Sequence, residues 1–176
     1  MNKLLILSGV PGSGKSYFST LVKNKRKHVY IVSSDNLRKQ MLGSQRDLSD
    51  EKTVWKVLYE LVKAYSFDER GVVILDATNI YSRYRIELFH MFKKYFKEIY
   101  LVFFSIKTET LINQNEEREF PVPLDVLQSF RERLEPPTEK EEQLFKAIFK
   151  DENHDIETPR ACVYLPDIRS HHHNFL

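Results

Sequence analysis

A glycine-rich segment near the start of the chain has the residue types needed to hold phosphate groups. Residues 9–16 read Gly-Val-Pro-Gly-Ser-Gly-Lys-Ser and fit the pattern G-x-x-x-x-G-K-[ST] at every position. Glycines let backbone N–H groups close around phosphate oxygens, and a following helix adds partial positive charge at its N-terminus. The segment therefore predicts a nucleotide site, and the residues expected to contact the phosphates of ATP are Gly12, Ser13, Gly14, Lys15 and Ser16.

Two residues of this loop have distinct chemical tasks. Lys15 is expected to reach the β- and γ-phosphates as a catalytic cation, and the Ser16 hydroxyl is expected to ligate Mg²⁺. ATP and Mg²⁺ are therefore the predicted cofactors, although the loop does not distinguish ATP from GTP as the donor. The base-reading N-K-x-D of GTPases does not occur in the chain. Asp76 is followed by Ala-Thr-Asn rather than by the Glu typical of mechanical ATPases, so a small kinase is favoured.

A second pair of residues could handle the group that accepts the phosphate. Asp35 and Arg38 follow an apolar strand candidate and lie three residues apart, so on a helix they share one face. A carboxylate at the carboxyl end of a parallel strand can accept the proton of an attacking hydroxyl. An arginine beside it can hold a phosphate with two hydrogen bonds. The alternative, an N-cap Asp next to a surface Arg, is equally compatible with the spacing.

The pattern of apolar residues predicts short strands that alternate with helices. Strands are expected at Lys3–Ser8, His28–Ser33, Gly71–Leu75 and Glu98–Ser105. Helices are expected from about Gly14, from Asp35 to about Met41, and over Glu51–Tyr65, Tyr81–Phe96, Thr108–Glu117 and Val122–Leu134. Leu144–Phe149 is compatible with either a helix or a fifth strand.

This alternation predicts an α/β fold: a doubly wound parallel sheet of the P-loop kinase type with helices on both faces. We expect residues 1–150 to form the kinase domain, with a lid at about 113–123. Residues 151–176 are expected to form a C-terminal extension that packs loosely. The roles of this tail and of His171, His172 and His173 are left open by the sequence.

Composition indicates the kind of protein and its compartment, but it does not identify a substrate. The chain has 176 residues and a formal net charge of +2, so overall charge does not by itself indicate a nucleic-acid binder. The apolar run near the N-terminus is too short for a signal peptide or a membrane span. A single cysteine, Cys162, cannot form an internal disulfide. We expect a cytoplasmic protein with no membrane partner.

At this point the chain resembles a known family, the 5′-kinase domains of polynucleotide kinases, of both the bacteriophage type and the polynucleotide kinase-phosphatases. Five matches occur in order over about residues 1–140. They are GxPGSGKS at Gly9–Ser16, D-x-x-R at Asp35 and Arg38, D-x-T-N at Asp76–Asn79, Arg118 before V-P-x-D-V at Val122–Val126, and E-P-P-T at Glu135–Thr138.

The resemblance implies ATP-dependent transfer of the γ-phosphoryl group to the 5′-hydroxyl end of DNA or RNA. It implies that Asp35 is the general base and that Arg38 holds the phosphate on the 3′ side of the terminal nucleotide. Arg118 would come from the lid and stabilise charge on the transferring group. Asp76 would bind substrate beside the phosphate loop, by orienting metal-bound water or acceptor-side groups.

The chain also departs from the family pattern. Gln114 stands where the phage enzymes carry a second lid arginine, and the lid is shorter and acidic. No D-x-D-G-T/V phosphatase signature occurs. The alternative function is a P-loop kinase of a small molecule such as a nucleoside, sugar or antibiotic, and a third is a non-catalytic nucleotide-binding module. The choice between DNA and RNA and the oligomeric state stay open.

Overall fold

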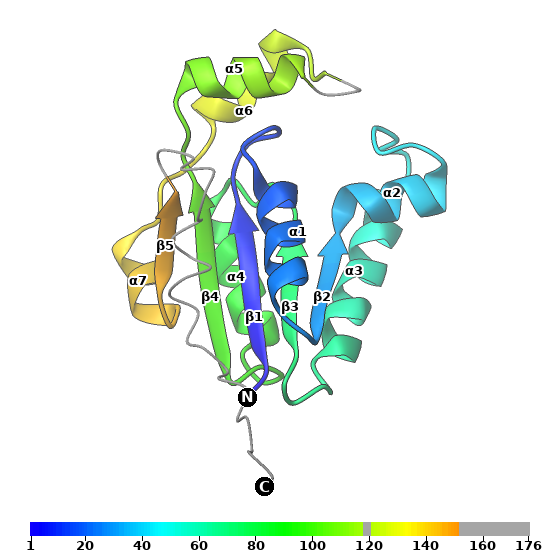
Figure 1. Cartoon of the computed structure of the whole chain (residues 1–176), viewed down its shortest axis with the longest axis vertical. Helices are drawn as coiled ribbons and strands as arrows, with labels where there is room; N and C mark the ends of the chain where they lie inside the picture. The colour runs from blue at the N-terminus through cyan, green and yellow to red at the C-terminus, as the bar shows by residue number, and fades with distance from the viewer. Residues whose placement is uncertain (118–120, 152–176) are drawn as a thin grey trace, which may run out of the picture.

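The computed structural model describes residues 1–117 and 121–151 and shows a five-stranded sheet with helices on both faces (Figure 1). The strands are β1 (Lys3–Ser8), β2 (Val29–Ser33), β3 (Val72–Asp76), β4 (Glu98–Phe104) and β5 (Ile148–Asp151). The helices are α1 (Lys15–Lys25), α2 (Ser34–Leu42), α3 (Glu51–Tyr65), α4 (Ser82–Phe92), α5 (Thr108–Glu116), α6 (Leu124–Glu132) and α7 (Glu139–Leu144).

All paired strands run parallel, in the order β2-β3-β1-β4-β5. This confirms the predicted fold class. Because β1 is central, the phosphate loop that follows it opens at the middle of the carboxyl edge of the sheet. Ser33 of β2 pairs in register with Asp76 of β3, so these two strands end side by side. Asp35 and Asp76 are thereby brought to the same edge.

The sheet is buried on both faces, which explains its nearly continuous apolar strands. On one face, Leu5 and Leu7 pack with Phe18 and Val22 of α1. On the other face, alternate strand residues pack against α3, α4 and the residues around the end of α7. A third, smaller cluster joins the phosphate-loop residue Val10 to α5 and α6, through side chains that include Leu111 and Leu127.

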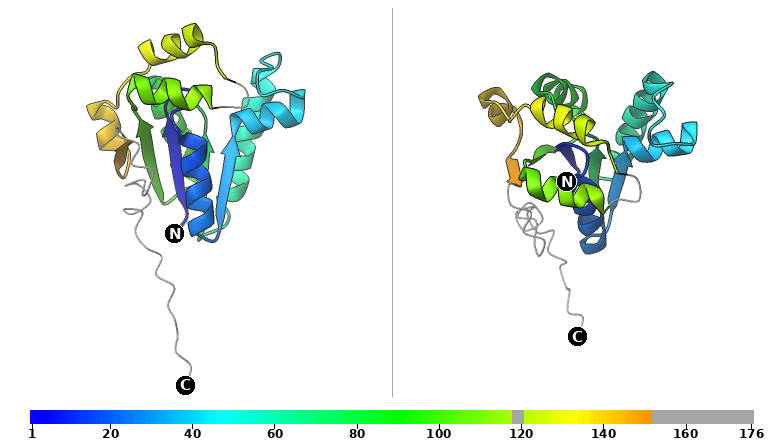
Figure 2. Two further views of the ribbon diagram at one scale, coloured as in Figure 1. Left: turned by 45° about the horizontal axis from the view of Figure 1, so that its top comes forward. Right: turned by 90° about the horizontal axis from the view of Figure 1, so that it is seen from above.

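The helices α5 and α6 lie beyond the carboxyl ends of the strands, on the side of the sheet where the phosphate loop opens (Figure 2). The lid predicted at about 113–123 takes in only the last residues of α5 and the residues that precede α6, and it stays a prediction. Residues 118–120 and 152–176 lie outside the described residues, and with them the predictions for Arg118, Cys162 and the terminal histidines. Among residues 1–117 and 121–151, no helix combines the length and apolar character that a membrane span requires.

Most predicted elements are present, and the differences have local causes. The helix predicted over Tyr81–Phe96 ends at Phe92, where the chain turns and places Phe96 in the core. The segment Leu144–Phe149, for which the sequence allowed a helix or a strand, takes part in both. Helix α7 ends at Leu144, and strand β5 begins at Ile148. The start of α7 was missed, although Thr138 and Glu141 form a capping box there.

Candidate active site

The phosphate loop has a backbone shape that depends on its glycines. Gly12 and Gly14 have φ of 81° and 92°, in the left-handed region that residues with a side chain rarely adopt. Gly9 is required for a different reason: a Cβ there would lie 2.6 Å from Ser13 Oγ. No side chain caps the N-terminus of α1, whose first turn begins at Lys15. The backbone at this terminus is thus arranged as an anion cradle.

Lys15 folds back across this loop. Its Nζ donates hydrogen bonds to the carbonyl oxygens of Gly9 at 2.9 Å and Val10 at 2.8 Å. The lysine is buried, but its ammonium group stays within the loop, where a phosphate could replace the carbonyl contacts. Ser13 is fully buried and does not line the cleft beside the loop. Any contact between Ser13 and a nucleotide would therefore involve its backbone.

Ser16 and Asp76 meet at the carboxyl edge of the sheet, as a magnesium site would require. Ser16 Oγ donates to Asp76 Oδ2 at 2.9 Å. Burial raises the pKa of Asp76, while the charge of Lys15 and the hydrogen bond from Ser16 partly oppose that shift. The part of the chain that the structure describes contains no group of three or more His, Cys, Asp or Glu that could hold a metal. Oxygen donors of this kind fit Mg²⁺, which usually keeps several waters and contacts substrate phosphates.

Asp35 and Arg38 lie together on α2, as their spacing predicts. Arg38 Nη1 donates to Asp35 Oδ1 at 2.6 Å. The N-cap of α2 is Ser33, whose Oγ accepts from the backbone N–H of Asn36, so Asp35 is not the capping residue. The Asp35 side chain is 57% exposed, which leaves it accessible from the cleft. The alternative of a capping aspartate beside a surface arginine therefore does not describe this pair.

Glu51 completes this acceptor-side cluster and was missed by sequence reasoning. Arg38 Nε and Nη2 donate to its two carboxylate oxygens at 2.5 and 2.9 Å. The hydrogen bond with Glu51 raises the pKa of Arg38, and the same bond lowers the pKa of Glu51. The Asp50 N-cap fixes where α3 begins, but no local signal pairs Glu51 with a residue on α2. We call Asp35, Arg38 and Glu51 the acceptor cluster, after the role that the sequence predicts for Asp35 and Arg38.

A cleft of about 640 Å³ brings these groups together. Its lining includes phosphate-loop residues, the acceptor-side pair Asp35 and Arg38, and the end of β3 from Asp76 to Thr78. Of the predicted site residues, the cleft is lined by Gly12, Gly14, Lys15, Ser16, Asp35, Arg38 and Asp76. Residues that the sequence did not single out also line it, among them Trp55, Glu117 and Phe130.

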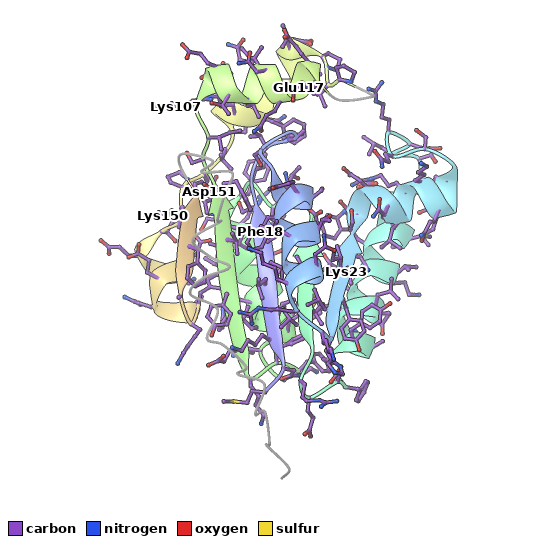
Figure 3. The ribbon with its side chains drawn as sticks, viewed as in Figure 1. Phe18, Lys23, Lys107, Glu117, Lys150 and Asp151 are labelled. Atoms are coloured by element: carbon purple, nitrogen blue, oxygen red, sulfur yellow. The ribbon has the colours of Figure 1, made fainter. Side chains whose placement is uncertain are left out.

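One side of the cleft is formed by residues of α5 and α6. Gln114 lines the cleft, and its buried Oε1 has no hydrogen-bond partner within the described part of the chain. A buried acceptor without a partner is costly, so this atom is suited to a ligand or water. Glu117 lies at the end of α5, above the strand ends (Figure 3), and adds a carboxylate to the lining. The adjacent Arg118 lies outside the described residues, so its catalytic role stays a prediction.

A buried arginine that sequence reasoning also missed fixes the segment after β3. Arg85 Nη1 donates to Ser8 Oγ and to the carbonyl oxygens of Asn79 and Ile80 at 3.1–3.3 Å. Its Nε donates to Glu141 Oε1 at 2.6 Å. Asn79, with φ of 42°, donates from Nδ2 to the Leu7 carbonyl. The D-x-T-N segment is thereby attached to the end of β1, next to the phosphate loop.

Comparisons with known proteins agree with this architecture. The model of a family described as "AAA domain" matches residues 4–137. L-seryl-tRNA(Sec) kinase of Methanococcus maripaludis is 29% identical over 147 residues, which are 78% of this chain and 54% of that protein. The 2′,3′-cyclic-nucleotide 3′-phosphodiesterase of Rattus norvegicus is 32% identical over 75% of this chain and 31% of its own length. The chain thus spans about half the length, or less, of these relatives.

Solved structures of other proteins share the fold of this chain. A chain of the Pnkp1/Rnl/Hen1 RNA repair complex superposes with a TM-score of 0.67 and 26% identity, over 82% of this chain and 46% of that one. Kti12 of Chaetomium thermophilum in complex with ADP-AlF3 has a TM-score of 0.66 and 19% identity, over 85% and 88% of the two chains, and so supports the fold alone. With the family model covering residues 4–137 and the nucleotide-binding loop intact, the chain belongs to the P-loop kinase family that this AAA-domain model describes.

Proposed function

We propose that the chain is an ATP-dependent kinase that transfers the γ-phosphoryl group to the 5′-hydroxyl end of DNA or RNA. The observation that carries this proposal is the position of the acceptor cluster. Asp35 and Arg38 line the same cleft as Lys15 and Ser16, so a base and a phosphate-binding cation face the phosphate loop. Similarity to a chain of an RNA repair complex supports a nucleic-acid acceptor.

In this mechanism Asp35 accepts the proton of the 5′-hydroxyl group. A bond forms between the 5′ oxygen and the γ-phosphorus, while the bond from that phosphorus to the β–γ bridging oxygen breaks. Lys15 stabilises the charge that develops on the phosphate oxygens, and Arg118 contributes from the lid. Mg²⁺, when bound, neutralises phosphate charge, and Ser16 with Asp76 would hold it.

Arg38 gives the proposal its specificity for an acceptor that carries a phosphate. A phosphate on the 3′ side of the terminal nucleotide can replace the Asp35 or Glu51 carboxylate as a partner of the guanidinium group. Loss of its bond to Arg38 would also free the Asp35 carboxylate oxygen to accept the hydrogen bond of the 5′-hydroxyl group. Acceptor binding and base activation would then be coupled through one arginine.

The alternative, a kinase of a small neutral molecule, is favoured by one feature. Arg38 is already bonded to two carboxylates, so an acceptor without a phosphate leaves the acceptor cluster undisturbed. Arg38 would then be a structural residue that orients Asp35. The two functions differ in whether a phosphate on the acceptor increases activity.

The deciding experiment measures transfer from labelled ATP, with Mg²⁺, to 5′-hydroxyl DNA and RNA oligonucleotides, nucleoside 3′-monophosphates and plain nucleosides. We expect transfer to the acceptors that carry a phosphate. Lys15→Ala should remove detectable transfer, and Asp35→Asn should abolish it while ATP binding survives. Glu69→Gln, an exposed carboxylate change in the segment before β3, is the matched control. Equal use of nucleoside and nucleoside 3′-monophosphate would support the small-molecule alternative instead.

A further inference from the structure

A second cleft, of about 410 Å³, continues from the candidate active site. The two clefts share Trp55, Thr78 and Phe130 in their linings. The second cleft lies between α3, α4 and α6, and six of its twelve lining residues are aromatic or arginine. They are Trp55, Tyr59, Tyr81, Tyr84, Phe130 and Arg133. We call this set the aromatic cleft.

The rings of the aromatic cleft are only partly buried, although Trp55, Tyr59 and Phe130 also pack against the hydrophobic core. Tyr84 is 42% exposed, and Trp55, Tyr59, Tyr81 and Phe130 are each partly exposed. Trp55 and Tyr59 lie one turn apart on α3, with ring centroids 5.7 Å from each other. Tyr81 and Tyr84 form an edge-to-face pair at 5.6 Å. Exposed rings that border a hollow offer faces on which a planar ligand can stack.

Guanidinium groups lie near two of these rings. Arg133, which lines the cleft, has its guanidinium 5.1 Å from the centre of the Phe130 ring. Arg83 is not part of the lining, and its guanidinium lies 4.6 Å from the centre of the Tyr84 ring. Rings that alternate with guanidinium groups are the combination that binds single-stranded nucleic acid, because bases stack on the rings while cations attract the phosphates. Glu87 belongs to the same lining and would repel a phosphate there, so the base rather than the backbone is expected inside the cleft.

The direction of α3 connects this surface to the acceptor cluster. Glu51, Trp55 and Tyr59 follow one another at intervals of four residues, so they share a face of the helix. That face leads from the bond between Glu51 and Arg38 into the aromatic cleft. A strand whose 3′-side phosphate contacts Arg38 would therefore carry its next base toward Trp55.

We propose that the aromatic cleft is a stacking subsite for a base of the single-stranded acceptor, on the 3′ side of the terminal nucleotide. This inference rests on the proposed function, and it predicts that affinity rises with acceptor length. A nucleoside 3′-monophosphate is too short to fill the subsite. An oligonucleotide of six residues fills it, and should bind more tightly for that reason.

Trp55 provides a direct probe, because it is the only tryptophan in the chain. Titration with a 5′-hydroxyl DNA or RNA hexamer should quench its fluorescence. Stacking of one base on a ring corresponds to a change in Kd of roughly fivefold or more, so Tyr84→Ala should weaken hexamer binding by at least that factor. Tyr84→Phe keeps the ring and should restore binding. Arg70→Ala, an exposed change in the segment before β3, is the matched control for Arg133→Ala.

Kinetic measurements distinguish a failure of the proposed subsite from a failure of the proposed function. With Tyr84→Ala and Arg133→Ala, the KM for the hexamer should rise about fivefold or more relative to the KM for the nucleoside 3′-monophosphate. Absence of transfer to every nucleic-acid acceptor by the unmodified protein would overturn the proposed function, and the fluorescence titration would still test the subsite. A hexamer Kd and KM that both stay within twofold in these variants would overturn the subsite while leaving the function intact.

Discussion

Two arginines of this chain make nearly the same ion pair in very different surroundings. Arg85 binds both carboxylate oxygens of Glu141 at 2.6 and 3.1 Å, and Arg38 binds both oxygens of Glu51 at 2.5 and 2.9 Å. The side chains of Arg85 and Glu141 are 0% exposed, whereas those of Arg38 and Glu51 are 12% and 33% exposed. Each pair joins two different helices, 13 residues apart for Arg38 and Glu51 and 56 residues apart for Arg85 and Glu141.

The remaining donors of the two arginines show what each pair is suited for. Arg85 directs them mainly at backbone carbonyls, at Asn79, Ile80 and Pro136, which cannot leave without unfolding the segment after β3. Arg38 directs its remaining bond at the Asp35 side chain, which a ligand can displace. The buried pair therefore fixes the segment after β3 that lines the candidate active site, whereas the partly exposed pair of Arg38 and Glu51 can change partners.

The pKa shifts of the two glutamates differ in the same way. Burial would raise the pKa of Glu141, but hydrogen bonds from Arg85 and Ser82 outweigh it and lower the pKa overall. For Glu51 the bond from Arg38 is itself the largest contribution to a lowered pKa. Glu141 thus depends on its partners to stay charged inside the protein, whereas Glu51 remains close to water.

The largest effect is expected from breaking the buried pair. Arg85→Ala would leave the Glu141 carboxylate buried without its cation, and removing one partner of a buried pair costs about 3–5 kcal/mol of unfolding free energy. Urea unfolding followed by circular dichroism measures this directly. Arg85→Met combined with Glu141→Leu should lose less than the single change, because no charge stays buried. If Arg85→Ala lowers the free energy of unfolding by less than about 1 kcal/mol, the buried pair stabilises the fold no more than an exposed one does, which would contradict the comparison.

Breaking the pair of Arg38 and Glu51 should change stability little and activity strongly. Arg38→Ala should change the free energy of unfolding by no more than about 1 kcal/mol, because the pair is partly exposed. The kcat/KM for a nucleoside 3′-monophosphate should fall at least roughly tenfold, since a charge-assisted contact contributes about 1.5–3 kcal/mol. A plain nucleoside should be little affected, and Arg70→Ala serves as the control. An equal loss for both acceptors would make Arg38 a residue that only orients Asp35.

The contrast also shows what sequence could and could not predict. The phosphate loop, the parallel sheet and the position of Asp35 at the carboxyl edge of the sheet follow from local patterns, because parallel strands end at one edge. The pair of Asp35 and Arg38 follows from helical spacing. Glu51, by contrast, contacts Arg38 from another helix, and no periodicity within either segment reports that contact.

Arg85 and Glu141 were hidden for a related reason. They are separated by 56 residues, and no pattern within either segment pairs them. Only the packing of α7 against α4 brings them together. The capping box formed by Thr138 and Glu141 was the one available signal, and it would have located α7 without revealing the partner of Glu141.

The smallest effect on stability is expected at Asp76. Its replacement should raise stability slightly but lower transfer activity. Burial raises the pKa of this carboxyl group, so its ionised form is disfavoured in the folded chain. Asp76→Asn keeps an oxygen that can accept from Ser16 but removes the buried charge. At neutral pH the variant should be slightly more stable, with Tm raised by no more than about 4 °C. Transfer activity should fall, because the proposed Mg²⁺ site loses its carboxylate.

The dependence on pH tests this interpretation of Asp76. Wild-type stability falls as pH rises through the interval between the ordinary aspartate pKa, about 3.9, and the raised value in the folded chain. Asparagine has no proton to lose, so the stability advantage of the variant is complete above the raised pKa. It should disappear as pH falls below the ordinary range, where Asp76 is neutral in both states. Thermal melts of both proteins across this range, with Glu69→Gln as the exposed control, measure the effect. A variant that is less stable than wild type at neutral pH would mean that the charge of Asp76 stabilises the loop through Lys15.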